Sequence, residues 1–352
     1  MAKKRSDSPE EMAQKVLAGD RRAAARMITL IENQSEKSNQ AMKLVYPHAG
    51  KSMVIGLTGA GGSGKSSLIN HLIRQYRDQG KRVGVVAVDP SSPFSGGALL
   101  GDRIRFQDHS MDDGVYIRSM GSRGYLGGLA RSTSDVVRTM EAMGNDIVIV
   151  ETLGAGQDEV DIIHVAQTCI LVLTPNMGDD IQAMKAGIME IADIIVLNKA
   201  DLDGAILCLR SLEATIHFAT SQKQGGWVSP LIPTVASAAK TKDLKGINEL
   251  VKTINDHQEY LHQSRAIDEV QEKRIEQELG LVFKDEVQKF IFKGLKGTGK
   301  KREYIKAIFE GRTDPYSVVE EVLGTFLKVG AKVNEKSGSK NRSNNRRIFL
   351  RN

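Results

Sequence analysis

One short glycine-rich segment constrains the fold of this chain more than any other feature. Residues 59–66 read Gly-Ala-Gly-Gly-Ser-Gly-Lys-Ser; the apolar run 53–58 precedes them, and 67–77 has apolar residues at helical spacing. Without Cβ atoms, glycines let several backbone N–H groups turn toward one point, and the following helix adds the positive end of its dipole. Strand, glycine loop, Lys-Ser and helix therefore predict a loop that holds the phosphates of a nucleoside triphosphate.

The same segment assigns roles to particular side chains. Lys65 can reach the outer phosphates and is a candidate catalytic residue, and the Ser66 hydroxyl can hold Mg²⁺. The residues expected to contact the nucleotide here are Gly59, Ala60, Gly61, Gly62, Ser63, Gly64, Lys65, Ser66 and Ser67.

A dinucleotide-binding fold fits some of the same residues. Gly59, Gly61 and Gly64 satisfy G-x-G-x-x-G, and Asp89 lies near the distance expected of a ribose-binding acid. The Lys-Ser pair argues against this alternative, because a pyrophosphate in a dinucleotide fold needs neither a lysine nor a magnesium-binding hydroxyl at that point.

Length and composition allow one large domain or two, because the chain has 352 residues. Apolar runs such as 147–150 and 169–173 are far too short to cross a bilayer, and the charged N-terminus is no secretory signal. The two cysteines, Cys169 and Cys208, suit a reduced, cytoplasmic setting better than a disulfide. No Cys/His cluster has the spacing of a structural zinc site.

The net charge of +6 is concentrated in one segment. Residues 331–352 carry seven Lys or Arg and one Glu, so they account for the whole surplus. Their Ser, Asn and Lys content predicts a mobile tail. A nucleic-acid-binding arm is an alternative, but no aromatic residues are interleaved to stack on bases, and we favour a solvated tail.

Alternating strand and helix patterns predict an α/β fold, a three-layer P-loop NTPase with a mainly parallel sheet and helical extensions at both ends. The pattern 9–34 predicts two helices broken near Gly19 and Asp20, and 264–295 predicts a long charged helix followed by two shorter ones near 302–309 and 315–327. The expected strands are 53–58, 82–89, 146–151, 169–174, 194–198 and 231–235. The expected domains are 1–50 (helical), 51–262 (nucleotide-binding), 263–330 (helical arm) and 331–352 (tail).

A second motif follows a predicted strand and favours guanine. The Asp201 carboxylate can accept bonds from N1–H and the amino group of guanine, donors that adenine does not offer together. The Asn198 amide can bond the base and tie loops together, while the Lys199 stem can lie over the ring. Backbone N–H groups of Ser237, Ala238 and Ala239 could bond the guanine oxygen, although such a segment is also an ordinary loop before a helix.

Acidic residues at other strand ends are candidate Mg²⁺ ligands. Glu151 stands where most P-loop GTPases have Asp, and Asp89 and Asp102 frame a long Pro/Gly/Ser-rich loop. Gly154 could present its N–H to the γ-phosphate. Gln157 could orient the attacking water, or it could be a solvent-facing side chain in a mobile loop.

Four long segments resemble the MeaB/ArgK/MMAA family of P-loop GTPases, which act as chaperones of cobalamin-dependent acyl-CoA mutases, chiefly methylmalonyl-CoA mutase. They read VLAGDRRAAARMITLIEN, VVAVDPSSPFSGGALLGDRIR, VIVETLGAGQDEV and TPNMGDDIQAMKAGIMEIADIIVLNKAD. The resemblance runs from about residue 10 to 330 and implies GTP as substrate with Mg²⁺.

The resemblance also implies further roles. The family's magnesium and switch acids match Asp89, Asp102 and Glu151, together with Ser66, and the helical region 263–330 would form a homodimer. The family's additional mobile segment matches a stretch in which Asp179, Gln182 and Lys185 would couple the nucleotide state to the mutase. The resemblance implies that cobalamin is bound by the mutase partner and involves this chain only indirectly.

Three other functions remain to be weighed. The family was formerly described as a kinase or ATPase of lysine/arginine/ornithine transport, but no phosphate acceptor or catalytic base is evident in the sequence. A nickel-insertion GTPase would be expected to carry Cys-x-x-Cys or a His-rich tract, which are missing. A nucleic-acid-binding protein, based on the basic tail, is the weakest of the three.

Overall fold

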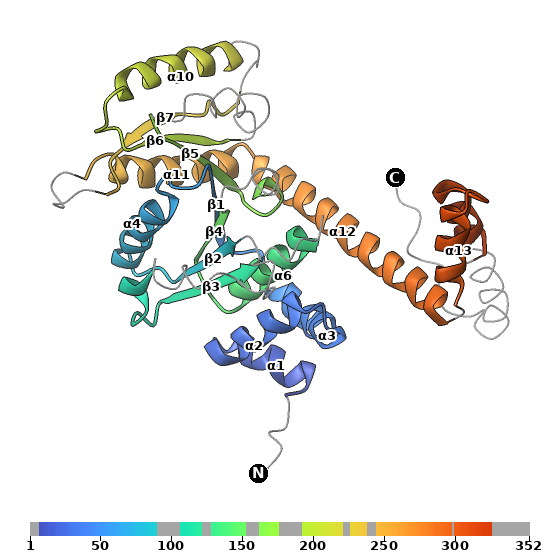
Figure 1. Ribbon diagram of the computed structural model, residues 1–352. Coiled ribbons are helices and arrows are strands. Elements are labelled where there is room, and N and C mark those ends of the chain that lie inside the picture. Colours follow the sequence, from blue (N-terminus) through green and yellow to red (C-terminus); the bar gives the residue numbers. More distant parts are fainter. Residues whose placement is uncertain are drawn as a thin grey trace. The chain divides into compact units, whose positions relative to one another are not determined.

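A computed structural model of the chain describes a parallel sheet with helices on both faces (Figure 1). The chain divides into two compact units, 1–281 and 282–352. The described residues are 7–89, 106–121, 128–152, 162–175, 192–220, 226–237, 244–297 and 299–325.

The first unit contains a seven-stranded sheet in the order β3-β2-β4-β1-β5-β6-β7, and all of its pairings are parallel. The central strand β1 lies between β4 and β5, and the glycine-rich segment follows it directly. The strands are β1 Met53–Thr58, β2 Val83–Asp89, β3 Val115–Gly121, β4 Ile147–Thr152, β5 Thr168–Leu173, β6 Ile194–Asn198 and β7 Leu231–Thr234.

The sequence predicts six of these strands to within one residue at each end, because their continuous Val, Ile and Leu runs are typical of strands buried on both faces. It misses β3. That strand forms one edge of the sheet, and its middle residues Ile117, Arg118 and Ser119 are only partly buried. An edge strand with a polar centre lacks the apolar run on which the prediction depends.

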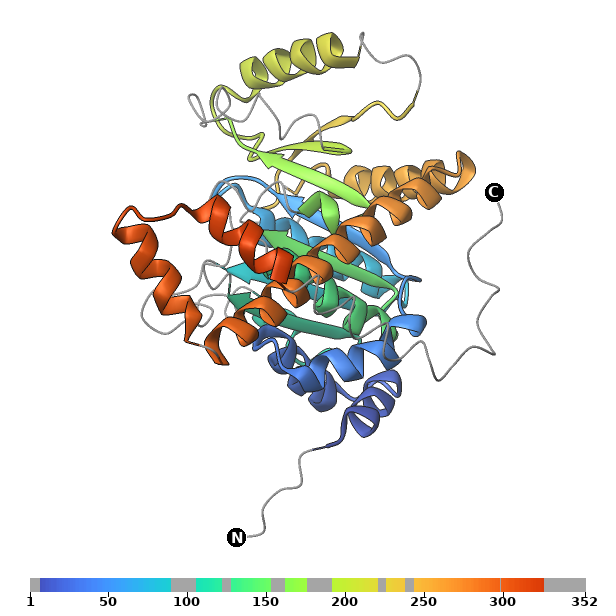
Figure 2. The same cartoon turned by 90° about the vertical axis from the view of Figure 1, so that its right-hand side faces the viewer.

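Helices cover both faces of the sheet and make the predicted three layers. Alternate strand residues point to opposite faces, so Val54 packs with α6 and the N-terminal helices, while Ile55 packs with α4 and α11. Figure 2 shows α10 at the β6–β7 end of the sheet and α1–α3 at the other end. The helices of this unit are α1 Pro9–Leu17, α2 Arg21–Glu32, α3 Glu36–Val45, α4 Lys65–Asp78, α6 Gly128–Ala142, α10 Ala205–Thr220 and α11 Ile247–Gln263.

The first two N-terminal helices, α1 and α2, lie close to the predicted residues. Ser8 and Glu11 form a capping box at the start of α1. The chain turns at Gly19, which has φ +80°, and the Asp20 carboxylate then accepts the N–H groups of Arg22 and Ala23 at 2.8 Å each. This confirms the predicted break; the third helix, α3, was not foreseen.

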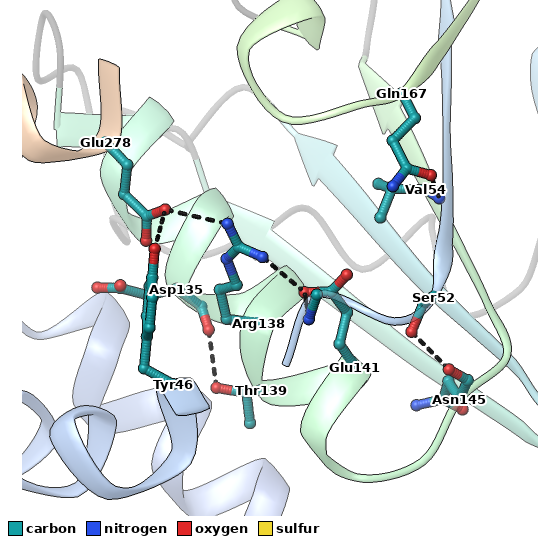
Figure 3. Close-up of polar contacts among 11 residues, drawn as sticks. Tyr46, Ser52, Val54, Asp135, Arg138, Thr139, Glu141, Asn145, Gln167 and Glu278 are labelled. Carbon is teal, nitrogen blue, oxygen red and sulfur yellow. Dashed lines mark hydrogen bonds and ion pairs between the residues drawn. The ribbon is translucent and has the colours of Figure 1, made fainter. Parts of the chain in front are cut away.

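The long helix α12, Ala266–Gly297, begins in the first unit, where a buried polar network holds it (Figure 3). The Glu278 carboxylate accepts bonds from Arg138 on α6 at 3.4 Å and from the Tyr46 hydroxyl at 3.2 Å. Arg138 also bonds Glu141 at 3.4 Å, and burial raises the pKa of that carboxyl. The Arg138–Glu278 bond links α12 to α6, and removing either partner would leave a buried charge without its counter-ion.

The second unit is helical as far as it is described. It contains the end of α12, α13 Lys300–Phe309 and a helix over 315–325. These elements match the predicted long helix and the two shorter helices. Across the described helices of the chain, none combines the length and apolarity needed to span a bilayer. Both cysteines are free thiols.

Candidate nucleotide-binding site

Two glycines in the loop after β1 lie where no side chain fits. Gly59 has φ +136°, and a Cβ there would lie 2.2 Å from the Val172 carbonyl oxygen. Gly64 has φ +95° and is the residue just before α4; its Cβ would lie 2.1 Å from Asn198 Nδ2. The loop therefore packs directly against β5 on one side and against the end of β6 on the other, which explains glycine at both positions.

The Lys65 side chain folds back over this loop. Its exposure is 4 %, and its Nζ donates to the Gly59 carbonyl at 2.5 Å and to the Ala60 carbonyl at 3.0 Å. A buried ammonium has a high free-energy cost unless polar groups surround it, so the carbonyls hold the charge at the mouth of the loop. The same position would bring it to the phosphates of a nucleotide seated on the loop N–H groups.

The structure brings Ser66 and Glu151 together. The Ser66 hydroxyl, on the first turn of α4, donates to Glu151 Oε1 at 2.7 Å. Glu151 lies near the end of β4 and is 1 % exposed; the parallel register pairs it with Leu57 on β1, directly before the loop. A hydroxyl and a carboxylate at this spacing are hard oxygen ligands of the kind Mg²⁺ prefers.

Asn198 joins the loop to the two strands beyond it. Its Nδ2 donates to the Ser63 carbonyl at 2.8 Å, and its Oδ1 accepts the Thr234 hydroxyl at 3.1 Å and the Ala236 N–H at 3.2 Å. It is 1 % exposed. The structure thus confirms that this amide ties loops together, as its place at the end of β6 predicts.

Lys199 and Asp201 lie next to Asn198, at the end of β6. Lys199 has φ +58°, and its Nζ donates to the Gly62 carbonyl at 2.8 Å, so its stem reaches from the end of β6 to the glycine loop. Asp201 is exposed, and Ser237, after β7, is exposed as well. The Ala200 N–H bonds the Thr234 carbonyl at 3.0 Å, which fixes the turn that carries Asp201 to the end of β7.

Some predicted site residues are described by their backbone alone or lie outside the described part of the chain. Asp89 ends β2, where it pairs with Gly121, and only its backbone is described. Among the residues that the structure describes, no group of three or more His, Cys, Asp or Glu side chains could hold a metal ion. The predicted residues that lie outside the described part of the chain are Asp102, Gly154, Gln157, Asp179, Gln182, Lys185, Ala238 and Ala239.

One contact at the site has no counterpart in the predictions. His71, on α4, bonds the Ala236 carbonyl through Nε2 at 2.9 Å. Ala236 directly precedes Ser237, so this histidine contacts the loop whose backbone N–H groups are expected to bond the guanine oxygen. The only sequence signal is that His71 is one of two polar residues in the otherwise apolar run LINHLI, which does not specify a partner 165 residues away.

A glycine loop between the central parallel strand and a helix, with its lysine held over the loop, defines a P-loop nucleoside triphosphatase. Comparison with known proteins narrows this class. The sequence profile described as "Methylmalonyl Co-A mutase-associated GTPase MeaB" matches residues 24–295. The chain belongs to the MeaB family, and it is a GTPase.

Sequence relatives agree with this membership, and a solved structure has the same fold. A Pyrococcus abyssi protein named as a candidate GTPase is 43% identical over 93% of this chain and 99% of its own length. GTPase ArgK of Escherichia coli is 32% identical over 80% of this chain and 86% of its own length. The crystal structure of an LAO/AO transport system kinase, at 23% identity, covers 93% of this chain and 99% of its own with a TM-score of 0.64, and it supports the fold.

Proposed function

We propose that this GTPase hydrolyses GTP with Mg²⁺ and uses the cycle to gate cobalamin loading of an acyl-CoA mutase of the methylmalonyl-CoA mutase type. The observation that carries the hydrolytic part is the meeting of three groups beside one glycine loop: the buried Lys65 ammonium, the Ser66 hydroxyl and the Glu151 carboxylate. The mutase part is supported by the family's description as methylmalonyl-CoA mutase-associated.

The chemistry at the phosphates would be mainly positioning and charge neutralisation. The loop N–H groups would bind the phosphate oxygens, and Lys65 would turn from the Gly59 and Ala60 carbonyls to the outer phosphates. Ser66 and Glu151 fit a magnesium ion, because their oxygens lie 2.7 Å apart and are hard ligands, with Asp89 and Asp102 as further candidates. The bound ion would neutralise charge on the phosphate oxygens. Gln157 would orient the water, and Gly154 would bond the γ-phosphate.

The base would be read on the other side of the loop. Asp201 would accept the two guanine donors, Lys199 would lie over the ring, and N–H groups of Ser237, Ala238 and Ala239 would bond the guanine oxygen. Two contacts support this arrangement: Lys199 already reaches the Gly62 carbonyl, and Asn198 bonds both the loop and Ala236.

Binding to the mutase should depend on the nucleotide. Asp179, Gln182 and Lys185 would transmit the nucleotide state, since a signal requires contacts that differ between two states. We expect a candidate methylmalonyl-CoA mutase to co-purify with this chain in amounts that change at least about threefold between a non-hydrolysable GTP analogue and GDP. Pull-down of the mutase with each nucleotide measures this.

Two outcomes would contradict the proposal. Equal recovery of the mutase with both nucleotides, or none with either, would remove the mutase as the partner that responds to the cycle. A matched control is Lys65→Ala, which should lose the difference between nucleotides. Incubation with γ-labelled GTP also distinguishes hydrolysis, which releases free phosphate, from a transport-system kinase, which labels a protein.

The second unit supports the further proposal that the chain forms a homodimer through its C-terminal helices. Among its described residues only Val322 is buried, whereas Phe309 is 90 % exposed, Tyr316 83 % and Phe283 69 %. Helices with so little buried surface cannot be stable alone. A second copy of the same helices would cover these side chains, as in many cyclic dimers.

Changing Phe309 should therefore weaken the dimer. We expect Phe309→Asp to raise the dimer dissociation constant at least about tenfold, because it buries a charge in the interface. Sedimentation equilibrium of the full chain measures it. Lys306→Gln on the same helix changes the net charge equally and removes no apolar surface, so it should leave the constant unchanged. A monomeric wild-type protein, or equal effects of both variants, would contradict the proposed interface.

A further inference from the structure

The contact between His71 and Ala236 joins two parts of the site that are far apart in sequence. His71 lies on α4, whose first residue is Lys65, and Ala236 lies just after β7. The distance from His71 Nε2 to the Ala236 carbonyl oxygen is 2.9 Å. A carbonyl oxygen can only accept, so Nε2 carries the proton and donates. The phosphate-binding helix thus bonds the residue that directly precedes Ser237.

Both backbone polar groups of Ala236 are hydrogen-bonded to side chains. Its N–H donates to Asn198 Oδ1 at 3.2 Å, and its carbonyl accepts from His71. The preceding residue, Val235, exchanges two backbone bonds with Lys245, at 3.1 and 3.3 Å. Those bonds lie before Ala236, whose own backbone groups bond Asn198 and His71.

We propose that His71 is a positioning residue for guanine recognition: its bond to the Ala236 carbonyl orients the Ser237 N–H, which belongs to the same peptide unit, toward the oxygen of the base. This inference rests on the proposed base site and adds to it a residue from the phosphate-binding helix. Asn198 links Ala236 to the Ser63 carbonyl, whereas His71 links it to α4, so the two sides of the bound nucleotide are joined by two independent routes.

Removing the donor should weaken guanine binding in a selective way. We expect His71→Ala to raise the dissociation constant for GDP about three- to tenfold, as for the loss of one hydrogen bond to a nearly buried carbonyl. The constant for ADP, which shares the phosphates and ribose but lacks the guanine oxygen, should stay within about twofold. In turnover, the KM for GTP should rise while kcat at saturation is unchanged, because Lys65 and Ser66 are untouched.

The measurement is competition against a fluorescent GDP by unlabelled GDP and ADP, with Mg²⁺ and the full chain. His71→Gln is the rescue variant, since its amide nitrogen can donate from nearly the same place, and it should bind GDP as the wild type does. Gln75→Ala is the matched control. Gln75 lies one turn further along α4 and bonds Asn248 on α11 at 3.2 Å, so Gln75→Ala removes a different hydrogen bond of the same helix and leaves Ala236 untouched.

The outcomes separate this inference from the proposed function. Equal weakening of GDP and ADP, a fall in kcat, or failure of His71→Gln to restore binding would show a general structural role and overturn the positioning role alone. Unchanged GDP affinity in His71→Ala would overturn it as well. A wild-type protein that binds GDP no better than ADP would overturn the base site itself, and the positioning role with it.

Discussion

Replacing Lys65 with alanine should lower kcat for GTP hydrolysis at least about a hundredfold, the effect expected when a major positive charge at transferring phosphates is lost. Among the described residues, Lys65 is the lysine whose Nζ bonds the Gly59 and Ala60 carbonyls. Release of phosphate at saturating GTP and Mg²⁺ measures the change.

The control for this variant is Lys81→Ala. Lys81 is exposed and follows the C-terminal end of α4. The Lys81→Ala substitution removes an equal charge without touching the glycine loop, so GTP hydrolysis should persist. A thermal melt of each variant checks that the fold survives the loss of a buried side chain. Retention of more than about a tenth of wild-type kcat by Lys65→Ala would contradict the role given to this lysine.

Asp201→Asn should exchange the preferred base. The oxygen of an asparagine can accept a hydrogen bond from one guanine donor, but its NH₂ group would face the other donor and could not accept from it. We therefore expect kcat/KM for GTP to fall about a hundredfold. Xanthine carries an oxygen where guanine carries the amino group, and the asparagine matches it. Xanthosine triphosphate should therefore become the better substrate, as competition between the two nucleotides in a hydrolysis assay would reveal.

A neighbouring carboxylate provides the control for base recognition. Asp203 is exposed two residues further on, and Asp203→Asn removes the same charge from the same turn. It should leave the preference for GTP unaltered. Retained GTP selectivity in Asp201→Asn, or an equal shift in Asp203→Asn, would count against the assignment of Asp201.

The central part of the fold could be predicted because it is encoded locally. The apolar run of β1, the glycines after it and the helical spacing of α4 are contiguous, and the structure has them at the predicted residues. The end of β6 could be predicted for the same reason, and with it the place of Asn198. The edge strand β3 could not, because its partly exposed centre carries Arg118 and Ser119 rather than an apolar run.

Contacts between distant residues could not be predicted in this way. The bond from Ser66 to Glu151 depends on the register of β4 beside β1, and the bond from His71 to Ala236 depends on how α4 packs against the end of β7. The buried bond from Arg138 to Glu278 depends on where α12 crosses α6. Each of these pairs is more than 80 residues apart along the chain.

The amino-acid sequence by itself determined the class of the protein: the six strands with continuous apolar runs, where the phosphate loop begins, and which side chains near it have the right chemistry. These features depend on neighbouring residues, whose spacing sets backbone geometry directly. Only the tertiary structure decided that Ser66 meets Glu151 and that His71 holds Ala236. Such pairs form through strand register and helix packing, which are set by burial of the whole core rather than by any one segment.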